Sequence, residues 1–197
     1  QPGFSQYPQP GFQPNYGAAV FNPNAFQNNL LRSFAAVFEP QRNHTAVFRN
    51  YFGQLSYYYV QGSWQKDVGS FAGVGVGGDM DAVFEKQRNH SAVFFKGTDG
   101  YLHYFYVQGG WKHDGTSFNA AGPVTGAVSA VFEPQRNHSA VFFKGGDGYL
   151  HYFYLGPNGW AHDSTSFRCG GRVKGEIRTI FEPQRNHSAV FFKGGDG

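Results

Sequence analysis

The stretch QRNHSAVF, residues 135–142, lies at the centre of a block that this chain repeats four times. Copies with Ser or Thr at the fifth position begin at Gln41, Gln87, Gln135 and Gln184, at spacings of 46, 48 and 49 residues. The residues after each copy repeat as well. Self-similarity at this period is typical of repeat proteins, in which each unit buries its apolar face against its neighbours.

Each unit is predicted to contain four short strands. In the third unit, SAVFEP (129–134) and HSAVFFKG (138–145) flank a polar QRN turn. A Gly-Asp-Gly hairpin signal follows, then YLHYFY (149–154) and a last short strand expected around 165–167. Four strands in about 48 residues is the size of one propeller blade. The predicted fold is therefore all-β, a β-propeller that is incomplete in this chain.

The third strand carries bulky residues on both faces, as expected for a sheet packed between two neighbouring blades. In the second unit, the two predicted faces are Tyr101, His103 and Phe105, and Leu102, Tyr104 and Tyr106.

The chain divides into a tail and a repeat region. Residues 1–34 contain two QPGF units and no charged residue before Arg32, so a low-complexity Gln/Pro/Gly-rich flexible tail is predicted. Predicted blades follow at 35–80, 81–129 and 130–178, with a partial blade at 179–197. Because the fourth unit stops after its second strand, its apolar edge would be bare. A longer natural chain is favoured, and self-association to complete the propeller is the alternative.

Composition narrows the classes of function. The 197 residues include 22 Phe, 12 Tyr and 28 Gly, and the net charge is +3. The charges are scattered rather than gathered into the basic stripe that phosphate backbones require, so no nucleic-acid partner is predicted. No run of about 18 apolar residues occurs, so no membrane span is predicted. The single cysteine allows no internal disulfide, and no cofactor is predicted.

A corner after the third strand carries the strongest binding signal. The pattern G-x₀₋₁-W-x-x-D-x-x-S-F holds in three units. A flat ring beside a carboxylate suits a saccharide, because the ring stacks on C–H groups while the acid accepts hydrogen bonds from hydroxyls. The alternative is structural, with the Trp sealing one blade against the next and the Asp fixing a turn. The candidate carbohydrate-binding residues are Trp64, Asp67, Trp111, Asp114, Trp160 and Asp163.

Histidines near that corner raise metal or acid–base chemistry as a further alternative. His103 and His151 lie in the third strand, while His113 and His162 lie beside the Asp. The first unit has Ser and Lys at these places, and no metal-binding motif occurs, so no metal site is predicted. Catalysis normally needs one asymmetric site rather than several equal ones. The chain is therefore predicted not to be an enzyme.

The QRN turn holds two further features. Each copy contains an N-x-S/T sequon, so its Asn is a candidate N-glycosylation site in a secretory pathway, unless it only serves the turn. Each turn arginine is expected to bridge to the glutamate three residues earlier, as an exposed pair of little strength, or to be a polar ligand at a blade edge. The asparagines are Asn43, Asn89, Asn137 and Asn186, and the pairs are Arg42–Glu39, Arg88–Glu85, Arg136–Glu133 and Arg185–Glu182.

The stretch GPVTGAVSAVFEPQRNHSAVFFKGGDGYLHYFY…GW…SF resembles the blades of the seven-bladed β-propeller lectins of bacteria and fungi. The likeness covers residues 35–197, although the first unit has YFGQL in place of GTDGYL. It implies sugar pockets between adjacent blades, with Trp64, Trp111 and Trp160 as candidates. A multivalent carbohydrate-binding lectin with glycan or glycoprotein partners is thus predicted, and secretion is expected with it.

A second resemblance competes. DAVFEKQRNHSAVFFKG (81–97) looks like the hemopexin repeat, which would imply a four-bladed propeller that binds matrix proteins, haem or other partners. Hemopexin blades place Tyr-Trp directly after F-F-K-G and usually close the ring with a terminal disulfide, which one cysteine cannot form. The lectin interpretation is therefore favoured, and a purely structural or adhesive repeat protein is a third alternative.

Overall fold

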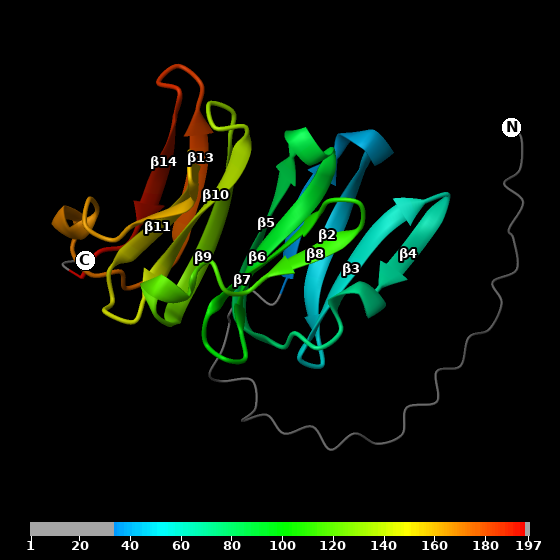
Figure 1. The fold of residues 1–197 in the computed structure, drawn as a ribbon, viewed down its shortest axis with the longest axis horizontal. Helices are drawn as coiled ribbons and strands as arrows, with labels where there is room; N and C mark the ends of the chain where they lie inside the picture. Colours follow the sequence, from blue (N-terminus) through cyan, green and yellow to red (C-terminus); the bar gives the residue numbers. More distant parts are fainter. Residues whose placement is uncertain (1–33, 196–197) are drawn as a thin grey trace, which may run out of the picture. The chain divides into compact units, whose positions relative to one another are not determined.

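The computed structural model describes residues 34–195, which form antiparallel sheets joined by short turns and 3-10 helices (Figure 1). The predicted tail lies outside the described residues, except for Phe34 at the start of the first strand. No helix in the described part of the chain is both long enough and apolar enough to cross a membrane.

Three four-stranded sheets and one two-stranded sheet follow one another along the chain, and within each sheet consecutive strands are hydrogen-bonded neighbours. This up-and-down order is that of propeller blades. Blade 1 has β1 (Phe34–Glu39), β2 (His44–Tyr51), β3 (Gln54–Gln61) and β4 (Ser63–Asp67). Blade 2 has β5 (Val76–Glu85), β6 (His90–Gly97), β7 (Leu102–Val107) and β8 (Trp111–Asp114). Blade 3 has β9 (Val124–Glu133), β10 (His138–Gly145), β11 (Leu150–Gly156) and β12 (Gly159–Asp163), and the partial blade 4 has β13 (Ile177–Glu182) and β14 (His187–Phe192).

The QRN segment forms the same turn in all four copies. Its Asn adopts a left-handed conformation, with φ between 48° and 54°. Asn tolerates this region better than most residues, because its short polar side chain can hydrogen-bond locally. The Asn N–H donates to the carbonyl three residues earlier, as from Asn43 to Pro40 at 3.1 Å. The predicted turn is confirmed.

Two strand boundaries differ from the sequence prediction. The first strands of blades 2 and 3 begin at Val76 and Val124, inside the segments assigned to the preceding blades, because the ends of the Gly-rich connectors pair with the second strands. The prediction of a fourth strand at 165–167 is wrong. The fourth strand is β12, and the carboxylate of Asp163 then accepts hydrogen bonds from the N–H groups of Thr165 and Ser166, which turns the chain toward a 3-10 helix.

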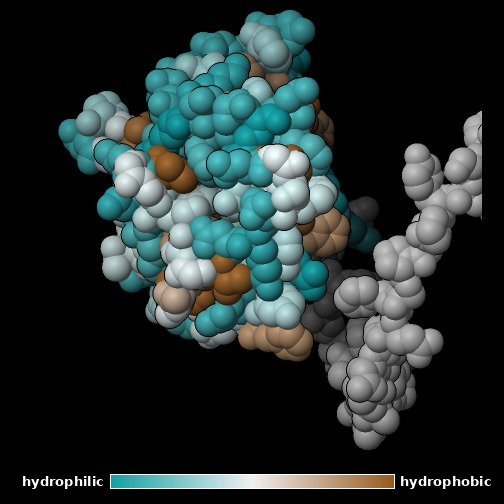
Figure 2. Space-filling view, turned by 90° about the vertical axis from the view of Figure 1, so that its right-hand side faces the viewer, coloured by the Kyte–Doolittle hydropathy of each residue, from teal (hydrophilic) through white to brown (hydrophobic). Residues whose placement is uncertain are grey.

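The hydrophobic core lies between the blades. The predicted alternation of the third strand is confirmed, since Phe105 packs in a cluster with blade 1 and Tyr104 in a cluster with blade 3. Fully burying one such side chain stabilises the fold by about 1.5–3 kcal/mol. The surface seen from the β4 side of the molecule is mostly hydrophilic, with small separate hydrophobic patches (Figure 2).

Candidate functional site

Each blade junction is organised around a buried glutamate. At the first junction, Glu39 is 1% exposed and accepts hydrogen bonds from Arg42 Nη1 at 2.6 Å, from the Tyr57 hydroxyl at 2.6 Å and from Ser91 Oγ of blade 2 at 2.5 Å. Burial alone would raise the pKa of Glu39, but the hydrogen bonds from Ser91, Tyr57 and Arg42 outweigh it and lower the pKa. The carboxylate is therefore ionised. Burial of the Tyr57 hydroxyl, together with its hydrogen bond to this carboxylate, raises the pKa of Tyr57.

The other junctions repeat this arrangement. Glu85 accepts from Arg88, Tyr104 and Ser139, and Glu133 accepts from Arg136, Tyr152 and Ser188. The four predicted Arg–Glu pairs are thus confirmed, at 2.6 Å for the first three and 3.3 Å for Arg185–Glu182. The expectation of exposed pairs is wrong for the first three copies, because the next blade covers each carboxylate.

The junction arginines keep donors available. Within residues 34–195, the hydrogen bonds of Arg42 and Arg88 all run through Nη1, which leaves Nε and Nη2 free to donate. The Arg42 guanidinium lies over the Tyr59 ring at 4.7 Å, and that of Arg88 over Tyr106 at 4.4 Å. These side chains are 24% and 19% exposed, so solvent reaches the junction beside them.

A histidine from the next blade completes the polar cluster. Arg42 Nη1 lies 3.4 Å from His90 Nε2, and Arg88 Nη1 lies 3.2 Å from His138 Nε2. Because arginine can only donate, Nε2 is the acceptor and Nδ1 carries the proton, which it donates to the backbone carbonyl of Ser91 or Ser139. Burial lowers the pKa of both imidazoles, which agrees with neutral rings.

Two of the predicted tryptophans lie at these junctions. The half-buried Trp111 meets the rings of His90 and Tyr57 edge-to-face, with centroids 5.1 and 5.3 Å apart. Trp160 stands in the same relation to His138, also at 5.1 Å. Among the aromatic rings of residues 34–195, Trp64 meets that of His44 alone, and it is 55% exposed. A Trp is thus part of a junction only where a preceding blade is present.

The structure separates the two halves of the predicted Trp–Asp corner. Trp111 and Asp114 lie three residues apart on β8, so their side chains leave opposite faces of the sheet. Asp114 Oδ1 accepts hydrogen bonds from the N–H groups of Thr116 and Ser117, and Asp67 and Asp163 hold the equivalent turns. The structural role foreseen for these carboxylates is present, and their role in saccharide binding stays a prediction.

The predicted histidines form a second cluster at the opposite end of blades 2 and 3. His103 Nδ1 lies 2.8 Å from His113 Nε2, and His151 Nδ1 lies 3.0 Å from His162 Nε2. Blade 1 has Ser56 and Lys66 at these positions. Within the described residues, no group of three or more His, Cys, Asp or Glu side chains is arranged to hold a metal ion.

Sequence reasoning gave no binding role to His90 and His138, although they belong to the same repeated string as the arginines. The signal that could have found them is the 48-residue offset, which places the His of one copy against the Arg of the copy before. The sequon asparagines are all exposed. Their glycosylation stays a prediction.

Other proteins of known structure share this arrangement of blades. No protein-family model matches the sequence, and no curated protein sequence matches it either. Among solved structures, AofleA from Arthrobotrys oligospora matches with a TM-score of 0.58 at 16% identity, over 85% of this chain and 52% of AofleA. A mutant of AofleA with three arginines replaced by alanine matches with a TM-score of 0.62 at 18% identity, over 86% of this chain and 53% of the mutant.

The SapL1 lectin, solved in complex with alpha methyl fucoside, matches with a TM-score of 0.55 at 14% identity, over 82% of this chain and 55% of SapL1. The chain thus spans about half the length of the solved structures it matches. These likenesses confirm the propeller prediction: the described residues are consecutive four-stranded blades, with a partial fourth blade, in the β-propeller fold of these proteins.

Proposed function

We propose that this chain is part of a multivalent carbohydrate-binding β-propeller, with a saccharide site at each complete blade junction. One observation carries the proposal: Arg88 of blade 2 meets His138 of blade 3, whose ring packs against Trp160, and the same three residue types follow one another at the preceding junction. An indole ring offers an apolar surface for sugar C–H groups, and the free guanidinium edge donates hydrogen bonds to hydroxyl oxygens.

The fold supports saccharides as the ligand class, since the SapL1 lectin shares it and was solved with alpha methyl fucoside. Each half-exposed junction would bind one sugar weakly. Several such sites on one rigid ring gain avidity on a multivalent glycan without new contacts.

A glycan array with the full chain tests the proposal first, followed by titration of the best sugar. Arg88→Ala should weaken binding at the second junction, because the guanidinium edge is lost. Arg172→Ala is the matched control, since Arg172 is an exposed arginine of the connector after blade 3 that lies over Tyr149 and outside the Arg–His–Trp junctions. Silence on the array, together with binding in a matrix-protein or haem screen, would overturn the proposal in favour of the hemopexin-like alternative.

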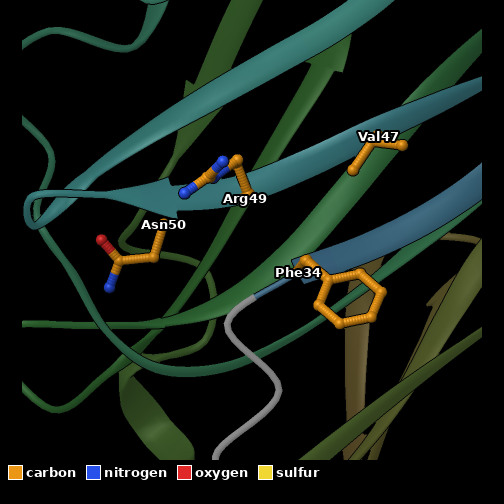
Figure 3. Close-up of a pocket in the computed structure, with 4 residues that line it drawn as sticks. All are labelled: Phe34, Val47, Arg49 and Asn50. Carbon is orange, nitrogen blue, oxygen red and sulfur yellow. The ribbon is translucent and has the colours of Figure 1, made fainter. Parts of the chain in front are cut away.

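We also propose that further blades, from a longer chain or from self-association, cover the two end faces. On blade 1, Phe34 is 61% exposed and lines a cavity of about 310 Å³ with Val47, Arg49 and Asn50 (Figure 3). On blade 4, Phe191 is 58% exposed, whereas its counterparts Phe48, Phe94 and Phe142 are buried. Light scattering over a concentration series tests self-association. A strictly monomeric chain at all concentrations would leave only the longer chain.

Secretion belongs to the same proposal, because extracellular glycans are the natural targets of a multivalent sugar-binding ring. The four exposed sequon asparagines would then be accessible to glycosylation. Expression in a eukaryotic secretory host, followed by treatment with a glycosidase that removes N-glycans, should shift the mass of the protein. An unshifted mass would remove the asparagines from the proposal.

A further inference from the structure

A carboxylate–histidine–histidine chain lies at the end of blade 2 opposite the QRN turn. Asp99, in the β6–β7 hairpin, accepts hydrogen bonds from the N–H of Tyr101 at 3.0 Å and from His103 Nε2 at 2.9 Å. Burial would raise the pKa of Asp99, but these hydrogen bonds lower it, so the carboxylate is ionised. His103 therefore donates from Nε2, and its Nδ1 accepts from His113 Nε2 at 2.8 Å.

The hydrogen-bonded groups Asp99, His103 and His113 border a cavity of about 260 Å³. Its walls are Asp99, His103 and His113, together with Thr98 and the connector Gly73-Val74-Gly75 from blade 1. The Asp99 side chain is 53% exposed, and within residues 34–195 it has no arginine or lysine partner. The cavity thus presents a carboxylate whose hydrogen-bond donors are His103 and the N–H of Tyr101.

Blade 3 contains the same chain of groups with one addition. His151 Nε2 lies 3.0 Å from Asp147 Oδ1, as in blade 2, but Arg168 Nη2 also donates to Asp147 Oδ2 at 3.2 Å. The Arg168 guanidinium lies over the Tyr149 ring at 4.8 Å. The carboxylate therefore holds a guanidinium without losing its histidine.

Blade 2 lacks this internal cation. The residue that follows the connector phenylalanine is Arg168 in blade 3 and Asn119 in blade 2. Tyr101 stands in blade 2 at the sequence position of Tyr149, and Asp99 at that of Asp147. The two blades thus differ in whether the chain itself supplies the positive group.

We propose that the Asp99 cavity binds a guanidinium or primary ammonium group of a ligand, at the carboxylate whose counterpart in blade 3 holds Arg168. The ligand's N–H groups would donate charge-assisted hydrogen bonds to the free lone pairs of the Asp99 carboxylate. This site is separate from the proposed saccharide junctions and does not depend on them.

Titration of the full chain with methylguanidinium, methylammonium and urea tests the proposal, with the His103 and His113 ring signals in NMR as the readout. Both cations should shift these signals, and neutral urea should bind at least about tenfold more weakly, because it brings no charge. Asp99→Asn should weaken cation binding by a similar factor. Equal binding of urea, or binding unchanged by Asp99→Asn, would overturn the proposal.

Two further substitutions give each blade the connector residue of the other, and they test the proposal without changing Asp99. Asn119→Arg should supply the internal guanidinium to blade 2 and abolish cation binding there. Arg168→Asn should open the Asp147 site and raise the stoichiometry of cation binding by one. Glu176→Gln is the matched control, because Glu176 is an exposed acid of the next connector that pairs with Arg178, and it should change nothing.

The ligand's origin is tested with two further probes. N-acetylarginine amide represents a side chain of a protein partner, and glucosamine represents a free amino sugar, with glucose as its uncharged control. Tighter binding of the first assigns the site to a protein partner, and tighter binding of the second to an amino sugar. Shifts as large with glucose as with glucosamine would contradict a cation site.

Discussion

Blade 1 and blade 2 have the same strand order and the same QRN turn, yet they differ on the face that looks toward the preceding blade. On blade 2 this face carries the half-buried Trp111 and the buried Phe95, both packed against blade 1. On blade 1 the same positions are Trp64, which is 55% exposed, and Arg49, which is also exposed. The same strand positions are thus buried where a blade precedes them and exposed on blade 1.

The two blades also differ at the end of the sheet that lies opposite the QRN turn. His103 of blade 2 uses both ring nitrogens in hydrogen bonds, whereas Ser56 takes its place in blade 1 and its buried hydroxyl has no partner in the described structure. Lys66 replaces His113 and lies over the Tyr51 ring at 3.6 Å. The comparison of the two faces teaches that burial is decided at the junction between two blades rather than within one blade.

The largest effect is expected at the buried glutamates. Glu85→Ala should lower the free energy of unfolding by about 3–5 kcal/mol, because Arg88, Tyr104 and Ser139 would lose a buried charged partner. Glu182→Ala, in the partial blade, should cost less than about 1 kcal/mol, since its pair with Arg185 is more exposed. Urea unfolding measures both, and equal losses would contradict the decisive role of the junction.

Tryptophan truncation should show a smaller contrast of the same kind. Trp111→Ala should cost about 2–3 kcal/mol, somewhat less than a fully buried Trp, while Trp64→Ala should cost under about 1 kcal/mol. Sugar affinity measured on the folded variants separates packing from binding. If Trp111→Ala lowers the melting temperature and leaves the affinity of the folded protein unchanged, the indole is not a ligand.

Acidification should sharpen the comparison further. Burial lowers the pKa of His90, His113, His138 and His162 below 6.5 in the folded state. The neighbouring His103 adds to the effect at His113, against Asp114 and Asp99. A lowered histidine pKa stabilises the fold above about pH 6.5, and that contribution is lost as the pH falls through the folded value.

Stability should therefore decrease from pH 7 toward pH 5, by at most about 1.4 kcal/mol per pH unit for each histidine. The double substitution His103→Ser with His113→Lys copies blade 1 into blade 2 and should flatten the slope. Urea unfolding at several pH values checks this. A free energy of unfolding that rises on acidification would refute it.

The smallest effect is expected at Ser56. Ser56→Ala removes a buried hydroxyl without a partner and should raise the free energy of unfolding by about 0–1 kcal/mol. Ser91→Ala is the contrasting variant, because Ser91 donates to the buried Glu39 and its loss should destabilise the fold. Thermal melts of the two variants should move in opposite directions.

Much of the fold could be predicted from the sequence. The strand HSAVFFKG at 138–145 coincides with β10, because a short continuous apolar run ends at a Gly-Asp-Gly hairpin that fixes its limit. The fourth strand was misplaced at 165–167, since Thr165 and Phe167 are strand-forming residue types, although they follow the turn that Asp163 holds. The Trp–Asp corner pointed to two tryptophans that lie at the junctions, but strand alternation puts the Trp and the Asp of each corner on opposite faces of the sheet.

The sequence by itself determined the repeat, the four-strand order, the left-handed Asn of each turn and the Arg–Glu pairs, because all of these depend on residues close together in the chain. Only the tertiary structure decided that His90 meets Arg42, that Ser91 meets Glu39 and that Trp111 is covered while Trp64 is not. These contacts join residues about 50 positions apart. Local preferences say which face a side chain takes, but only the packing of blade on blade decides what lies opposite it.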